Sequence, residues 1–125
     1  MDQSIGIIGC GAIGQALLRA AESGAMVGTV AGVTSRTEST ARAFLSTLRN
    51  PPPYLDRDSL IERASLVVEM AGGHVFPDLA RDTFSSGKDL MVISIGALLE
   101  YPEIIEQSRI SGCRLLAPSG AIAGL

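Results

Sequence analysis

Apolar residues along the chain form short uninterrupted runs, and these alternate with segments in which apolar residues recur every three or four positions. A short run rich in Ile, Val and Leu is typical of a strand that is buried on both faces of a parallel sheet. The runs predict strands at residues 5–8, 29–34, 66–70, 90–94 and 114–117.

The segments between these strands have helical periodicity with one apolar face. The first predicted helix carries a single apolar stripe of Ile13, Ala16, Leu17, Ala20 and Ala21, and it ends at Gly24. The second, at residues 38–49, is expected to bury Ala41, Phe44, Leu45 and Leu48. Further helices are predicted at residues 58–63, 76–87 and 102–111, the middle one burying Leu79, Ala80, Thr83 and Phe84.

The breaks between these elements carry turn residues. Asn50 and the three prolines at residues 51–53 cannot continue a helix and predict a loop. Turns are predicted after the second, third and fourth strands, at residues 35–37, 71–74 and 95–97. Strand and helix thus alternate five times within the length of one domain, residues 1–125. This pattern predicts an α/β fold with a doubly wound parallel sheet.

The first predicted strand runs directly into a glycine motif, Gly9-x-Gly11-x-x-Gly14, with Ala12 and Ile13 between the last two glycines. In a Rossmann-type domain these glycines allow a sharp turn, close approach of a pyrophosphate, and close packing of helix on strand. The pyrophosphate lies at the helix N-terminus, where free N–H groups favour an anion. The motif favours a dinucleotide-binding domain. The alternative is a glycine turn with a purely structural role.

Three later strand ends also carry glycine, at Gly72-Gly73, Gly96 and Gly120. Ligands of doubly wound sheets bind at the carboxyl ends of the strands, so these turns favour a dinucleotide extended across the sheet. We expect Ala71, Gly72, Gly96 and Ala97 to contact it. The alternative is that tight turns simply prefer glycine.

The end of the second strand bears on cofactor choice. An Asp or Glu about twenty residues after the glycines commonly binds the ribose 2′-OH of NAD. Here the turn is Thr34-Ser35-Arg36-Thr37, with no acidic residue. A hydroxyl and a guanidinium suit a 2′-phosphate instead, so Ser35 and Arg36 are candidate NADP contacts. The alternative for Arg36 is a solvated surface side chain.

Three other residues stand out near the predicted strand ends. Glu69 lies inside an apolar strand, where an acid is either satisfied by nearby donors or titrates at the site; we favour the structural role. His74 is the only histidine and has no partner at the spacing of a triad or a metal site, so no catalytic or metal-binding residue is assigned. Cys10 is interpreted as a small residue tolerated in the glycine loop.

Composition narrows the class of protein. The chain is 46% hydrophobic but only 4% aromatic, which predicts an aliphatic core, and its formal net charge is −3. Without a basic cluster or a membrane-length apolar run, nucleic acid and membranes are not expected partners. The two cysteines, Cys10 and Cys113, are far apart in sequence. We expect a soluble cytoplasmic protein with free thiols.

The strand-end segments resemble the N-terminal domain of the L-aspartate dehydrogenase family. The resemblance rests on residues 7–14, 67–72, 87–98 and, above all, 118–125. It implies NAD or NADP as cofactor and reversible oxidation of L-aspartate, with hydride passing between the aspartate Cα and nicotinamide C4. The product, iminoaspartate, hydrolyses to oxaloacetate or feeds NAD biosynthesis. Ala121 matches the family's cofactor-contacting alanine.

The resemblance covers only about the first half of a family member. The catalytic histidine and a cofactor-binding asparagine of the family lie further on, so we expect dinucleotide binding without aspartate dehydrogenase activity from this chain alone. The alternatives are a homoserine dehydrogenase-like domain and a non-catalytic NAD(P)-sensing module. Residues 122–125 are expected to leave an apolar surface uncovered, which predicts a homo-oligomer.

Overall fold

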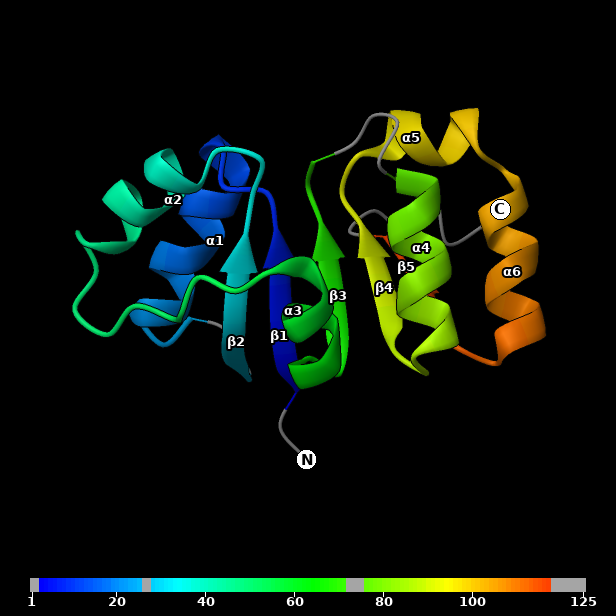
Figure 1. Cartoon of the computed structure of the whole chain (residues 1–125), viewed down its shortest axis with the longest axis horizontal. Coiled ribbons are helices and arrows are strands. Elements are labelled where there is room, and N and C mark those ends of the chain that lie inside the picture. Colours follow the sequence, from blue (N-terminus) through cyan, green and yellow to red (C-terminus); the bar gives the residue numbers. More distant parts are fainter. Residues whose placement is uncertain (1–2, 26–27, 72–75, 118–125) are drawn as a thin grey trace.

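The computed structural model describes residues 3–25, 28–71 and 76–117, and its centre is a parallel five-stranded sheet covered by helices (Figure 1). The strands are β1 (Ser4–Ile8), β2 (Thr29–Thr34), β3 (Leu66–Glu69), β4 (Asp89–Val92) and β5 (Leu115–Leu116). The helices are α1 (Ala12–Glu22), α2 (Glu38–Leu45), α3 (Arg57–Arg63), α4 (Phe76–Ser85), α5 (Ile95–Glu100) and α6 (Glu103–Ser111). The predicted doubly wound α/β fold is confirmed.

The strand order is β2-β1-β3-β4-β5, with every neighbouring pair parallel. Ile8 at the end of β1 pairs with Thr34 of β2 on one side and with Glu69 of β3 on the other. The three strands therefore end level, and the loops that follow them start side by side. Because the chain goes outward in opposite directions from β1, this is the switch point where doubly wound sheets bind ligands.

A single residue extends the sheet beyond β2. Tyr54 forms an isolated parallel bridge with Val33, made by hydrogen bonds from Val33 N–H to the Pro53 carbonyl (3.0 Å) and from Leu55 N–H to the Val33 carbonyl (2.9 Å). Counted as a strand position, Tyr54 gives the sheet the strand order of the dinucleotide-binding fold.

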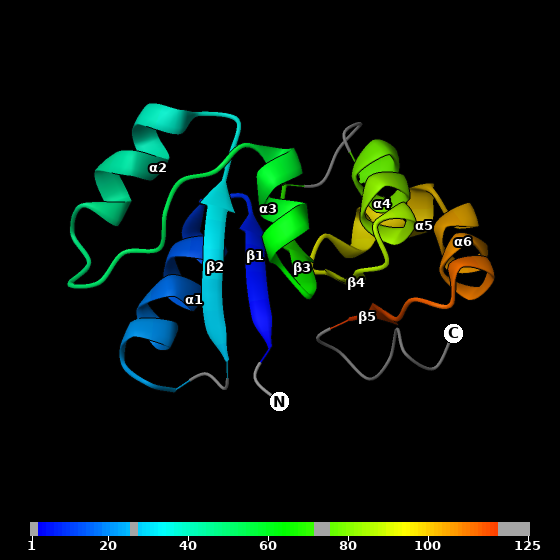
Figure 2. The same ribbon diagram turned by 60° about the horizontal axis from the view of Figure 1, so that its bottom comes forward.

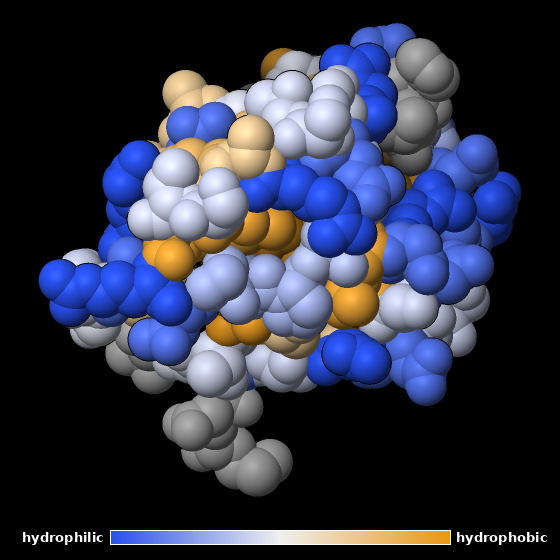
Figure 3. Space-filling model, turned by 60° about the vertical axis from the view of Figure 1, so that its left-hand side comes forward, coloured by the Kyte–Doolittle hydropathy of each residue, from blue (hydrophilic) through white to orange (hydrophobic). Residues whose placement is uncertain are grey.

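Helices cover both faces of the sheet (Figure 2), and a hydrophobic cluster lies beneath them on each face. Neighbouring strand residues point to opposite faces, so Ile7 belongs to the cluster under α1 and α2, while Ile8 belongs to the cluster under α3, α4, α5 and α6. The core is mainly aliphatic, as predicted, and it also buries all three phenylalanines. On the side that carries α2, hydrophobic residues lie recessed among hydrophilic ones (Figure 3). No helix of the described ranges has the length and hydropathy to cross a membrane.

The predicted buried face of α1 is partly wrong. Ile13 is 60% exposed and Ala16 is exposed, whereas Gly14 and Leu18 are the buried residues. The cause is the close approach of helix to strand at Gly14, where an added Cβ would lie 2.6 Å from the carbonyl oxygen of Gly9. This contact turns the Gly14 side of the helix toward the sheet and carries Ile13 outward.

Two other elements differ from their predictions, while the strand bounds agree within two residues. Helix α2 ends at Leu45, although Leu48 is buried as predicted. Residues 95–97, predicted as a turn, begin helix α5, in which Ala97 and Leu98 join the core cluster. Burial of these two side chains favours a helical turn and outweighs the low helix propensity of Gly96, which is exposed.

Candidate functional site

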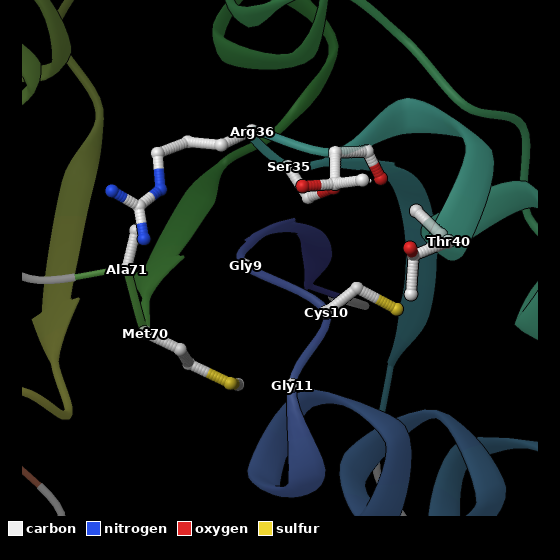
Figure 4. Close-up of a pocket in the computed structure, with 10 residues that line it drawn as sticks. Gly9, Cys10, Gly11, Ser35, Arg36, Thr40, Met70 and Ala71 are labelled. Atoms are coloured by element: carbon white, nitrogen blue, oxygen red, sulfur yellow. Dashed lines mark hydrogen bonds between the residues drawn. The ribbon is translucent and has the colours of Figure 1, made fainter.

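A pocket of about 290 Å³ opens where β1, β2 and β3 end (Figure 4). It is lined by the glycine loop after β1, the turn after β2 with the start of α2, and the end of β3. Its lining residues are Gly9, Cys10, Gly11, Ser35, Arg36, Thr37, Thr40, Ala41, Met70 and Ala71. The location is the one at which a doubly wound sheet binds a nucleotide.

The three motif glycines meet different structural demands. Gly9 has a φ of +112°, and an added Cβ would lie 3.1 Å from the backbone carbon of Met70. Gly14 is held against the Gly9 carbonyl, as described above. Among the described residues other than its chain neighbours, Gly11 has no heavy atom within 4 Å of the position that a Cβ would occupy. Nothing in the described structure therefore requires glycine at residue 11, and the open space there can admit a ligand to the backbone.

Gly11 is also the N-cap of α1, and its neighbours Ala12 and Ile13 are exposed. The first turn of this helix carries no acidic residue. The first N–H groups of an α-helix lack intrahelical partners and, with the helix dipole, they favour an anion. The residues present thus fit a pyrophosphate, with Gly9 and Gly11 as the backbone surface and the α1 N-terminus as the donor.

The β2 side of the pocket is formed by residues with hydroxyl and guanidinium groups (Figure 4). The Ser35 hydroxyl donates to the Thr37 carbonyl at 3.1 Å. The exposed Arg36 side chain extends across the pocket, and its guanidinium forms no hydrogen bond or ion pair with the described residues. The nearest acid in sequence, Glu38, is paired with Arg42 one helical turn on. Arg36 therefore brings to the pocket a cation that is unpaired among the described residues.

Cys10 forms part of the pocket wall and is 9% exposed. Burial raises the pKa of its thiol above the usual value, so the thiol is protonated at neutral pH. Cys10 and Cys113 are both free thiols. The protonated, buried thiol agrees with the interpretation of Cys10 as a small residue within the loop.

Glu69 is completely buried at the end of β3. Its Oε1 accepts a hydrogen bond from the Ser94 N–H at 3.2 Å, which joins the end of β3 to the start of α5. This bond supports the structural role favoured from the sequence. Within residues 3–25, 28–71 and 76–117, no three His, Cys, Asp or Glu residues are placed to hold a metal ion.

The structure brings five of the sequence-predicted contacts into one pocket: Gly9, Gly11, Ser35, Arg36 and Ala71. Gly14 lies beneath the glycine loop, and Ala12 and Ile13 lie beside it. Gly96 is exposed on α5, and Ala97 is 7% exposed within the core. Gly72, His74 and Ala121 lie outside the described residues.

Sequence reasoning missed several pocket residues and one residue behind them. Thr37, Thr40 and Ala41 face the pocket because α2 begins directly after the turn. Their hydroxyl-rich spacing at the start of the predicted helix was the available signal for Thr37 and Thr40. Tyr54 supports the turn from behind, and its position after the prolines gave no comparable signal.

Comparison with known proteins agrees with this site. Residues 9–118 match the family model described as "Homoserine dehydrogenase, NAD binding domain". The "L-aspartate dehydrogenase 3" of Bordetella bronchiseptica is 33% identical, over 99% of this chain and 46% of that protein. The L-aspartate dehydrogenase of Bradyrhizobium diazoefficiens is 34% identical, over 97% of this chain and 43% of that protein. The chain thus spans less than half the length of these relatives.

Solved structures show the same fold at lower identity. A homoserine dehydrogenase from Thiobacillus denitrificans superposes with a TM-score of 0.76 and 19% identity, over 94% of this chain and 29% of that one. An imine reductase variant from Myxococcus stipitatus, in complex with NAD+, superposes with a TM-score of 0.74 and 19% identity, over 94% of this chain and 40% of that one. Both likenesses concern the fold, which is that of NAD-binding proteins.

Proposed function

We propose that this chain, which belongs to the family of homoserine dehydrogenase NAD-binding domains, is the cofactor domain of an L-aspartate dehydrogenase-like oxidoreductase. The observation that carries the proposal is the open space at Gly11, which faces the ligand pocket in front of the α1 N-terminus. The relatives named L-aspartate dehydrogenase direct the choice of substrate.

Two groups of pocket residues are expected to bind two different parts of the dinucleotide. The pyrophosphate is expected on Gly9, Gly11 and the first N–H groups of α1. The adenosine ribose is expected beside Ser35 and Arg36, at the end of β2. The β2 turn has no acid to accept a 2′-OH, and it carries a guanidinium that no described residue pairs, so NADP(H) is expected to bind at least as well as NAD(H).

The reaction requires more than this domain. The nicotinamide ring supplies hydride chemistry, and its expected contacts are Ala71, Gly72, Gly96, Ala97 and Ala121. In the proposed enzyme the hydride passes between the Cα of L-aspartate and the nicotinamide. The described residues of the pocket carry no acid–base group positioned for that step. The proposal also includes that the protein is cytoplasmic and that it forms a homo-oligomer.

A homoserine dehydrogenase-like reaction is the second candidate. It is favoured by the description of the matching family model and by the structural neighbour from Thiobacillus denitrificans. Both candidates use the same cofactor pocket, so the difference between them lies in the substrate half of the enzyme.

The test is a fluorescence titration of the chain with NADPH and with NADH. Saturable binding of at least one of them is expected, and binding of neither contradicts the proposal. The same samples are assayed for NAD(P)H production from L-aspartate and from L-homoserine. No turnover approaching about 1 per second, a low value for an enzyme, is expected from this chain alone.

A further inference from the structure

The turn after β2 is held from behind by one hydroxyl group. The Tyr54 hydroxyl donates a hydrogen bond to the Ser35 carbonyl at 2.7 Å. It also accepts one from the Ser35 N–H at 3.2 Å. Both backbone polar groups of Ser35 are therefore fixed by the same side chain, directly before Arg36.

Tyr54 is itself fixed from two sides. Its backbone neighbours, Pro53 and Leu55, hydrogen-bond to Val33 of β2. Gly32 makes this approach possible, because an added Cβ there would collide with the Leu55 side chain. The guanidinium of Arg42 lies 5.1 Å from the centroid of the Tyr54 ring and forms a cation–π contact.

The position of Tyr54 relative to the pocket determines how this residue can affect cofactor binding. The Tyr54 hydroxyl lies behind the turn, and Tyr54 is not among the residues that line the pocket. The residue whose backbone it fixes, Ser35, lines the pocket, and the side chain of the next residue, Arg36, extends toward Ala71 at the end of β3 (Figure 4). Binding a phosphate through Arg36 costs less conformational entropy when the backbone that carries the side chain is already ordered.

We propose that Tyr54 is a positioning residue for cofactor selectivity, whose hydroxyl holds the Ser35–Arg36 backbone so that Arg36 can bind the 2′-phosphate of NADP(H). The inference rests on the proposed function, because it requires a dinucleotide in the pocket. Tyr54 acts through Arg36, and its hydroxyl makes no contact with the cofactor. Its loss affects NADPH more than NADH, which lacks the 2′-phosphate.

The test variant is Tyr54→Phe, which removes the hydroxyl and retains the ring beneath Arg42. We expect the Kd for NADPH to rise about three- to tenfold, in keeping with the loss of hydrogen bonds that act indirectly. The Kd for NADH should change less than about twofold on the same basis. Tyr101→Phe is the matched control, because Tyr101 is the only other tyrosine and lies after α5, away from the pocket.

A double-mutant cycle with Arg36→Ala tests the route of the effect. In the Arg36→Ala background, Tyr54→Phe should no longer change NADPH affinity. Unchanged NADPH affinity in the single variant, an equal loss for both cofactors, or an undiminished effect without Arg36 would each overturn the inference. A wild-type chain that binds neither cofactor would instead overturn the proposed function. Circular dichroism of each variant establishes that the fold is retained.

Discussion

The two glycines that flank the start of α1 should give opposite results when substituted. Gly11 has free space at its Cβ position and an extended backbone, with φ −83° and ψ −160°, which any residue can adopt. Gly14 has a backbone oxygen 2.6 Å from that position. We therefore expect Gly11→Val to impair dinucleotide binding with little effect on stability, and Gly14→Ala to impair stability first.

The expected magnitudes follow from these contacts. A side chain at Gly11 displaces the pyrophosphate from the N–H groups behind it. Loss of one or two hydrogen bonds to a charged group, at about 1.5–3 kcal/mol each, weakens binding from about tenfold to about ten-thousandfold or slightly more. A less suitable N-cap lowers the free energy of unfolding by about 1 kcal/mol or less. For Gly14→Ala, overpacking costs about 2–3 kcal/mol, and the better helix propensity of Ala offsets about 1 kcal/mol.

The assay combines NADPH titration with thermal unfolding of the wild type and both variants. Gly11→Val should unfold within about 4 °C of the wild type, whereas Gly14→Ala should unfold about 4–8 °C lower. If Gly11→Val bound NADPH with wild-type affinity, the glycine loop would not be the pyrophosphate site. If Gly14→Ala matched the wild type in stability, the close approach of helix to strand would not be a constraint.

Three further predictions concern other residues. Arg36→Ala should weaken NADPH binding about tenfold, leave NADH binding nearly unchanged, and reduce the effect of salt on NADPH affinity; a strong NADH preference of the wild type would contradict this. Saturating NADPH should slow alkylation of Cys10 at pH 8 without protecting Cys113, as measured by mass spectrometry, because only Cys10 lines the pocket. Asp56 caps α3, and hydrogen bonds from Ser59 lower its pKa below the usual value. The charged form therefore stabilises the fold at higher pH, and the loss of thermal stability in Asp56→Ala should vanish as the pH falls through that lowered pKa.

The parallel sheet could be predicted because its strands are nearly continuous apolar runs with few competing interpretations. The resemblance to L-aspartate dehydrogenases is confirmed by relatives about one-third identical over nearly the whole chain. The positions of Gly9, Ser35 and Ala71 at one edge follow from the level ends of β1, β2 and β3. Their contact with a cofactor stays a prediction until binding is measured.

The features that could not be predicted from the sequence depend on contacts between distant segments. The apolar stripe of α1 follows ideal periodicity, but the real face is set by the distance from Gly14 to the Gly9 carbonyl. Gly96 is typical of a turn, yet burial of Ala97 and Leu98 makes its segment helical. In both cases a local signal was overridden by packing, which periodicity alone does not contain.

Tyr54 is the strongest example, because its role combines three separate segments. The prolines before Tyr54 show no hydrophobic periodicity from which its position could be predicted. Its position also depends on Gly32, which leaves room for Leu55 beside β2. Only then does its hydroxyl reach both polar groups of Ser35. The Ser35–Arg36 turn supplies the chemistry for a 2′-phosphate, and the supporting loop fixes its geometry. Cofactor preference in such a domain should therefore depend on the residues that hold the β2 turn as well as on those that touch the cofactor.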